Sequence, residues 1–413
     1  INSPVAILAQ ALAQGEFVLR SREGHIVEMT DIPATMKAVV NKRQGDKLVY
    51  GVAEIPTPTV SDEKDLVIKV EAAPINPSDL GSVGMLARFG ADSIAAGEAA
   101  STVTVPFPQA LAGMFKADGD TKPVGNEGAG VVVAAGSAPE AQALLGKRVA
   151  VAVGSSYAQY TKTSLNNPMF AVLPDDVSAL EGASVFVNPL TVLGFIHTTK
   201  QEGHKAIVHT AAASQLGRML VKQCKEEGIP LVNIVRKEEG VEVLKAIGAE
   251  FVVNSSLPSF KEDLLAAVKA TGATIAFDAT GGGTLAMDIL TAFDTSLRQL
   301  YPDQVHPAYG PAMVRTVYKY GGLDKRNSEF LPSVGVGNWS WAGWLMPFHF
   351  AKYGEEHRAA SIKQAAAGLK TIFSTSFGTN LSLEDLAKSP EEYLATLQSQ
   401  TDKKFVVLPN GPM

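Results

Sequence analysis

The chain has 413 residues, a formal net charge of −6, 46% hydrophobic residues and one cysteine. This length exceeds what one hydrophobic core usually serves, so we expect two domains. The mild acidity excludes a general attraction to nucleic acid or anionic lipid, and the single Cys224 excludes an internal disulfide and a zinc site built from several thiolates.

The N-terminal residues 1–35 are predicted to be an extension with one short helix over residues 5–19. That helix is either a surface helix or a segment that docks onto a partner. No secretory pattern of basic start, apolar core and cleavage site is present. We therefore expect a soluble intracellular protein, in the cytosol or in an organelle matrix such as that of the mitochondrion. Because the first residue is Ile, we also expect that the N-terminus has been processed or lies at an experimental boundary.

The next part of the chain has the pattern of β-structure. Residues 37–41, 66–72, 128–135 and 148–153 are valine-rich or alternating runs next to turns and glycines. Residues 81–122 are rich in small residues and are expected to form an inserted loop with one helix. We predict a β-rich domain over residues 36–187.

From residue 188 onward, short apolar runs alternate with helical patterns of about ten residues. The predicted strands are 206–210, 231–235, 251–253, 274–277 and 314–318, and the predicted helices are 214–227, 239–247, 260–270 and 284–293. This alternation is typical of βαβ units on a parallel sheet. The sequence therefore predicts a doubly wound α/β domain over residues 188–372. A last apolar strand, 405–408, could return to the first domain, which residues 373–413 would complete.

The segment 330–351 has no charged residue and contains all three tryptophans. Its length would allow a membrane-spanning helix. Two prolines and three glycines interrupt it, however, and polar residues are interspersed. We therefore expect a buried strand, a subunit interface or an apolar pocket wall.

The first strand-to-helix turn of the α/β domain is the place where a dinucleotide would bind. Such a site needs a tight turn whose backbone lets a diphosphate reach the helix N-terminus. Here the turn contains small residues, a capping-type Ser214, Gln215 and Leu216, and a single glycine, Gly217. An ordinary strand-to-helix turn would explain the same residues equally well.

Two cations end the next predicted strand. An NAD site usually places Asp or Glu there, whereas this chain has Arg236 and Lys237. Cations suit a 2′-phosphate and hence NADP, although a pair of solvated charges is the simpler alternative. Glycines around Gly281 and Gly322 follow two further strands at the same edge, where they would let a cofactor approach the backbone or would only make turns.

The sequence contains no recognisable metal site. The seven histidines are scattered, and no two of them have helical spacing. His209 lies on a strand that is predicted to be buried, so we interpret it as a core residue.

Several of these segments resemble the zinc-free medium-chain dehydrogenases/reductases, which include quinone oxidoreductases and 2-enoyl thioester reductases. The resemblance runs from about Met36 to the C-terminus. It rests on Ala73–Pro74–Ile75–Asn76–Pro77–Ser78–Asp79, on Gly125–Asn126–Glu127–Gly128–Ala129–Gly130, on Asn188–Pro189–Leu190–Thr191 and on Val232–Asn233–Ile234–Val235–Arg236.

The resemblance implies a GroES-like catalytic domain, a Rossmann NADP-binding domain, an active site between them and a homodimer. In the zinc-dependent branch a histidine and cysteines hold the metal, but here Asn126 and Asn76 stand at those places. The ligand chemistry therefore argues against zinc catalysis. Two features depart from the family: Ser214 and Gln215 replace glycines, and residues 81–122 lack the tyrosine that the enoyl reductases carry.

Two functions are consistent with these features. In the first, NADPH delivers hydride to an enone, a quinone or an enoyl thioester without a metal, with Asn76 and Thr191 lining the nicotinamide side. Asn76 could instead fix the turn before Pro77. In the second, the chain is a catalytically silent reductase-fold subunit that acts as an accessory component of a larger assembly, docked through residues 1–35.

Overall fold

The computed structural model describes residues 18–20, 26–28, 32–79, 95–97, 102–330, 337–387 and 404–412. The chain divides into two compact units, which we describe separately. Unit 1 comprises Ile1–Ala183, Asn380–Gln398 and Val406–Met413, and unit 2 comprises Ser184–Thr379 and Ser399–Phe405. The finer division at residues 35 and 187, with residues 373–413 completing the first domain, stays a prediction.

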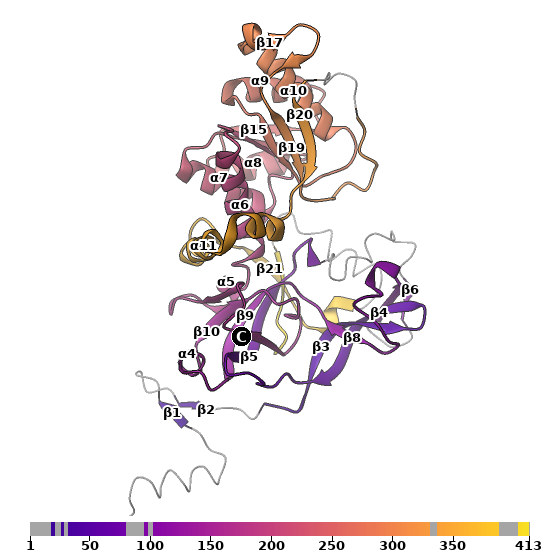
Figure 1. The fold of residues 1–413 in the computed structure, drawn as a ribbon, viewed down its shortest axis with the longest axis vertical. Helices are drawn as coiled ribbons and strands as arrows, with labels where there is room; N and C mark the ends of the chain where they lie inside the picture. Colours follow the sequence, from indigo (N-terminus) through magenta and orange to yellow (C-terminus); the bar gives the residue numbers. More distant parts are fainter. Residues whose placement is uncertain are drawn as a thin grey trace, which may run out of the picture. The chain divides into compact units, whose positions relative to one another are not determined.

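Unit 1 is built on β-sheets (Figure 1). One sheet has the order β12-β10-β9-β5-β22-β21 with β11 also paired to β5, and another has the order β6-β7-β4-β3-β8. Their strands are β3 (Thr35–Gln44), β4 (Lys47–Pro56), β5 (Asp65–Pro74), β6 (Ala95–Ala96), β7 (Thr102–Pro106), β8 (Thr121–Pro123), β9 (Gly128–Ala135), β10 (Arg148–Val151), β11 (Tyr160–Ser164), β12 (Phe170–Val172), β21 (Phe377–Leu381) and β22 (Lys404–Val407). The short hairpin β1 (Val18–Arg20) and β2 (Ile26–Glu28) precedes them. Short helical segments complete the unit: η2 (Gln109–Leu111), α4 (Pro139–Gln142), α5 (Ala179–Gly182) and η5 (Glu384–Ala387).

The central strand β5 explains how the sequence holds this unit together. Its side chains Leu66 and Ile68 pack with Val132 of β9 and Val149 of β10 in one buried apolar cluster. Burial of such apolar surface is the main stabilising contribution. The C-terminal β22 pairs antiparallel with the end of β5, which confirms that the last apolar run returns to this sheet.

The strands predicted near residues 37, 66, 128 and 148 are confirmed as β3, β5, β9 and β10. The predicted insertion, 81–122, lies partly outside the described residues. Its described part contains β7, β8 and the short 3-10 helix η2, and β7 pairs with β4. Of the helix predicted over residues 5–19, only Val18 and Leu19 are described, and they lie in strand β1 rather than in a helix.

The carboxylate of Asp65 anchors the loop before β5. Its Oδ2 accepts hydrogen bonds from the Ser61 amide at 2.9 Å, the Asp62 amide at 3.0 Å and Lys162 Nζ at 3.1 Å. These contacts, that of the Ser61 amide first, lower the pKa of Asp65 to about 2. They stabilise the ionised carboxylate and therefore the fold at neutral pH.

We expect Asp65→Asn to lower the free energy of unfolding by about 1–2 kcal/mol at neutral pH. Because the folded pKa lies below the unfolded value, this advantage is complete above about pH 5 and disappears as the pH falls toward about 2. Urea unfolding of both proteins at pH 7 and at about pH 3 measures it. A difference between the two proteins that is equal at both pH values would contradict the assignment.

Unit 2 contains a parallel sheet in the order β15-β14-β13-β16-β19-β20 (Figure 1). Its strands are β13 (Ile207–His209), β14 (Leu231–Val235), β15 (Phe251–Asn254), β16 (Ile275–Asp278), β19 (Arg315–Lys319) and β20 (Trp339–Gly343). Its helices are α6 (Val187–Gln201), α7 (Gln215–Glu227), α8 (Glu238–Ala246), α9 (Phe260–Thr271), α10 (Leu285–Leu300) and α11 (Met346–Ala367), and η3 (Pro302–Gln304) and the hairpin β17 (Val305–His306) with β18 (Gly310–Pro311) are smaller additions. This strand order is that of a Rossmann fold, which confirms the predicted α/β class.

Local signals in the sequence fix the helix that follows β13. Ser214 caps α7 by accepting a hydrogen bond from the Gly217 amide at 3.2 Å, and Gly228 ends the helix in the left-handed conformation, with φ of 65°. Cys224 lies inside this helix and is 2% exposed. The interpretation of Cys224 as a small buried hydrophobe is therefore confirmed.

The uncharged segment 330–351 contains a strand followed by a helix. Residues 331–336 lie outside the described part, Trp339 begins β20, and α11 begins at Met346. Trp339 and Trp341 pack against the core of unit 2. Within the described ranges, no helix combines the length and the apolar character that crossing a bilayer would require.

Candidate functional site

The carboxyl ends of the parallel strands bring the predicted cofactor residues of unit 2 to one edge. The turn that begins α7 follows β13, Arg236 follows β14, Gly281 follows β16 and Gly322 follows β19. The strand order reverses between β13 and β16, the point at which open α/β sheets bind ligands. The fold thus places residues from four different parts of the sequence at one edge of the sheet.

The turn between β13 and α7 is tightly closed. Ala211 adopts φ of 50° although it is not glycine, and the Ala212 amide donates to the Ile234 carbonyl at 3.1 Å. A Cβ at Gly217 would lie 2.0 Å from the Ala212 carbonyl oxygen. Only glycine therefore allows α7 to pack this closely on the turn. Ser214 serves as the helix cap.

A buried hydrogen-bond network connects this turn to the end of β16. The Thr210 hydroxyl donates to Asp278 Oδ1 at 2.7 Å and accepts from the Ala279 amide at 2.8 Å. The other carboxylate oxygen of Asp278 accepts from the Gly281 amide at 3.0 Å. The two loops on either side of the strand-order reversal are therefore tied together by hydrogen bonds between buried groups.

The two predicted cations are exposed at the end of β14. Arg236 immediately follows the buried strand and Lys237 is the N-cap residue of α8. A third cation, Arg326, binds Asp324 at 2.6 Å. This ion pair, with a smaller contribution from the charge of Arg236, lowers the pKa of Asp324 to about 2. The Asp324–Arg326 pair was not predicted, because it lies in a loop with no regular pattern.

The two glycine positions differ in how closely they are packed. Gly281 has φ of 73°, and a Cβ there would lie 2.6 Å from the Gly321 carbonyl oxygen. Its own carbonyl accepts a hydrogen bond from Lys319 Nζ at 2.9 Å. Gly322 is exposed, and a Cβ there would meet nothing within 4 Å. The structure therefore explains why residue 281 is glycine and gives no steric reason for glycine at 322.

Thr191 and His209 are both held by internal hydrogen bonds in unit 2. Thr191 lies in the first turns of α6, is 7% exposed, and donates to the Val187 carbonyl at 2.6 Å. His209 is fully buried, with Nε2 2.7 Å from the Tyr320 hydroxyl, and burial lowers its pKa to about 3. The interpretation of His209 as a neutral core residue is therefore confirmed.

Asn76 belongs to a buried polar network in unit 1. Its amide Nδ2 donates to Glu127 Oε1 at 3.0 Å, and its backbone N–H donates to Asp79 at 2.7 Å. Asp79 also accepts a hydrogen bond from the backbone N–H of Asn126 at 2.7 Å. Asn76 and Glu127 are fully buried and Asp79 is 2% exposed. This network fixes the turn around Pro77, as one of the two interpretations of Asn76 requires.

No family model matches the chain, but its sequence resembles curated proteins. It is 27% identical to the mouse prostaglandin reductase-3 over 266 residues, which cover 63% of this chain and 62% of the mouse protein. It is 25% identical to the quinone oxidoreductase of Pseudomonas aeruginosa over 230 residues, 55% of this chain and 68% of that one. The mitochondrial enoyl-[acyl-carrier-protein] reductase of Arabidopsis thaliana is 26% identical over 53% of this chain and 52% of its own length. The match to the mouse protein thus spans less than two thirds of its length.

Solved structures match a larger part of the chain. A protein from Mesorhizobium loti, assigned as an NADPH:quinone reductase, superposes with a TM-score of 0.67 and 26% identity over 92% of this chain and all of that one. The Etr1p/NADP/crotonyl-CoA complex superposes with a TM-score of 0.63 and 19% identity over 91% of this chain and all of that one, and supports the fold alone. The proteins that the chain resembles thus include quinone oxidoreductases and enoyl reductases of the medium-chain dehydrogenase/reductase superfamily.

Proposed function

We propose that the chain is an NADPH-dependent oxidoreductase that reduces an activated C=C bond or a quinone. The observation that carries this proposal is the edge of the parallel sheet at the strand-order reversal. There, a glycine-packed turn begins α7 and two exposed cations, Arg236 and Lys237, follow β14. This arrangement fits a dinucleotide with a phosphate on its adenosine ribose.

The residues at this edge fit the separate parts of NADPH. The first turn of α7, Ser214 to Gly217, would hold the diphosphate, because helix N-termini present N–H groups and a positive dipole end. Arg236 and Lys237 would bind the 2′-phosphate. The backbone at Gly281 and at Gly322 would allow close approach of the cofactor.

The bound nicotinamide would supply the hydride, and the residues of the chain would bind and orient. In this proposal Thr191 lines the nicotinamide side. Because its hydroxyl proton is donated to the Val187 carbonyl, its oxygen would accept a hydrogen bond from an N–H of the cofactor. Asn76 acts through the network with Glu127 and Asp79, which holds the turn around Pro77. The amides at positions 76 and 126 do not suit a catalytic zinc ion.

The substrate class follows from the names of the relatives. They include quinone and enoyl thioester reductases, so we propose an enone, a quinone or an enoyl thioester as substrate.

A homodimer is proposed from the family resemblance, and a mitochondrial matrix location from the mitochondrial enoyl reductases of Arabidopsis thaliana and Rattus norvegicus. Residues 1–35 would dock the chain into a larger assembly. Sedimentation of the chain with and without these residues would test this.

Turnover with NADPH tests the proposed activity directly. The full chain should bind NADPH, measured by fluorescence or calorimetry, and should oxidise it when given a quinone or a crotonyl thioester. Tight NADPH binding with no oxidation on any acceptor of these classes would instead favour the accessory subunit. No NADPH binding at all would refute both the activity and the assigned cofactor.

A further inference from the structure

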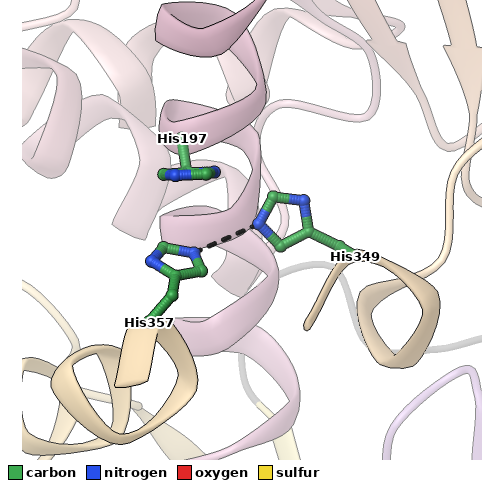
Figure 2. Close-up of side chains that lie close together, drawn as sticks. All are labelled: His197, His349 and His357. Carbon is green, nitrogen blue, oxygen red and sulfur yellow. Dashed lines mark hydrogen bonds between the residues drawn. The ribbon is translucent and has the colours of Figure 1, made fainter. Parts of the chain in front are cut away.

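Three histidines from distant parts of the sequence lie together in unit 2 (Figure 2). His197 lies on α6, and His349 and His357 lie on α11. One ring nitrogen from each lies within 4.8 Å of the others. The cluster does not include any residue that we assign to the cofactor or to the substrate.

A break in α11 brings two of these rings into contact. Gly354 lies between His349 and His357 and has non-helical angles, φ of 89° and ψ of 177°. In an unbroken helix, residues eight positions apart are separated by about 12 Å along the axis. Here the two Nε2 atoms are 3.3 Å apart. The sequence could not reveal this contact, because it depends on the break.

This spacing matches what a metal ion requires. Zinc binds imidazole nitrogen at about 2.0–2.1 Å in tetrahedral geometry, so two of its nitrogen ligands lie about 3.3–3.4 Å apart. The Nε2 atoms of His349 and His357 already have this separation. The His197 ring lies 3.9 Å from the His357 ring, measured between centroids, and 5.2 Å from the His349 ring. A shift of side chains by less than 2 Å would complete a three-nitrogen site, since the required nitrogens are already within 4.8 Å.

One ring nitrogen of His197 lacks a partner. Its Nδ1 is buried and has no hydrogen-bond partner among the residues that the structure describes. Buried polar atoms are nearly always paired, and an exception calls for an explanation such as an ion. A cation coordinated through Nδ1 would satisfy this nitrogen and would also replace the contact between the two Nε2 atoms.

The surroundings of His349 orient it as a ligand. Its Nδ1 lies 3.2 Å from the Thr198 hydroxyl, which also accepts a hydrogen bond from Trp344 Nε1 at 3.1 Å. With the proton on Nδ1, the Nε2 lone pair faces the cluster. Metal-binding histidines are commonly fixed in this way by a hydrogen bond at the other ring nitrogen.

The geometry points to a binding site for a divalent transition-metal ion of the zinc class, held by His197, His349 and His357. We propose that the ion ties both segments of α11 to α6, with water in the fourth position. Three imidazoles suit Zn²⁺, Cu²⁺, Ni²⁺ and Co²⁺ and do not suit Mg²⁺ or Ca²⁺, which prefer oxygen ligands. This proposal is independent of the proposed oxidoreductase activity.

The metal-free full chain, with any affinity tag removed, should bind one equivalent of Zn²⁺ in a calorimetric titration. Co²⁺ should give the intense visible absorption of a tetrahedral site, and Zn²⁺ should raise the thermal unfolding temperature, because it binds the folded state. Failure of Zn²⁺ to bind, or a Co²⁺ spectrum like that of the hydrated ion, would overturn the proposal.

Two variants and a control assign the ligands. His357→Gln and His197→Phe, which keeps an aromatic ring in place, should each weaken Zn²⁺ binding at least about 100-fold and abolish the tetrahedral Co²⁺ spectrum. His306→Ala removes an exposed histidine elsewhere in unit 2 and should change neither. Zn²⁺ affinity that is equal in all four proteins would show that these histidines are not the site. NADPH binding to the same samples is expected to be unchanged, so the two proposals fail separately.

Discussion

Replacing Arg236 and Lys237 together with alanine should weaken NADPH binding by about 100- to 1000-fold and NADH binding by less than about threefold. Each charge-assisted hydrogen bond to a phosphate contributes about 1.5–3 kcal/mol, and only NADPH carries the 2′-phosphate. Both side chains are exposed at the end of β14, so their removal leaves the buried strand intact. The dissociation constants of both cofactors, measured by calorimetry at fixed ionic strength, provide the test.

A matched control lies on the same helix. Lys245 is exposed in the last turn of α8, at the end opposite to Lys237. Lys245→Ala removes the same charge but should leave both dissociation constants within about twofold, because charges in water are screened over about 10 Å. Equal losses for NADPH and NADH in the double variant would remove the claim of selectivity for the phosphorylated cofactor.

Gly217→Ala should disrupt the turn that the diphosphate needs. The new methyl group would lie 2.0 Å from the Ala212 carbonyl oxygen and 2.6 Å from its carbon, both of which are backbone atoms. Backbone cannot move aside as a flexible side chain can. We expect a loss of about 3 kcal/mol in the free energy of unfolding and NADPH binding at least about 100-fold weaker.

The companion variant is Gly322→Ala, at a glycine with no atom within 4 Å of the added methyl group. It should not lower the free energy of unfolding by a measurable amount, because no atom of the chain crowds the added methyl group. Thermal unfolding and fluorescence titration of both variants decide the question. If Gly217→Ala bound NADPH as tightly as the unaltered chain, the turn before α7 would not be the diphosphate site.

The sequence predicted most of unit 2 because its central strands, β13, β14 and β16, are buried along their whole length. Such strands appear as short apolar runs between helices, and β14 was predicted with its observed bounds, Leu231–Val235. The helix α6 was missed, since it is buried on nearly all sides and has no amphipathic period. The helix α11 and its break at Gly354 were not predicted either, because α11 lacks an amphipathic period as well.

Within the candidate site, the sequence predicted only those residues whose role follows from their place in the order of strands and helices. Arg236 and Lys237 could be placed, because the end of the second strand has a fixed role in this fold. The network that joins Thr210 to Asp278 was not predictable, since it spans 68 residues and depends on the pairing of β13 with β16. The three-histidine cluster required the same kind of tertiary information.

One departure from the family has a structural role in unit 2. Ser214, which the sequence indicated as a capping-type residue, is the N-cap of α7 and accepts a hydrogen bond from the Gly217 amide. A helix cap of this kind stabilises the helix by about 1 kcal/mol.

The most direct measurement is a crystal structure of the chain grown with saturating NADPH. It should show the adenosine 2′-phosphate against Arg236 and Lys237 and the diphosphate at the first turn of α7. A crevice at the end of β14 that stays empty, or that the chain's own side chains fill, would contradict the account and leave the fold without its proposed cofactor.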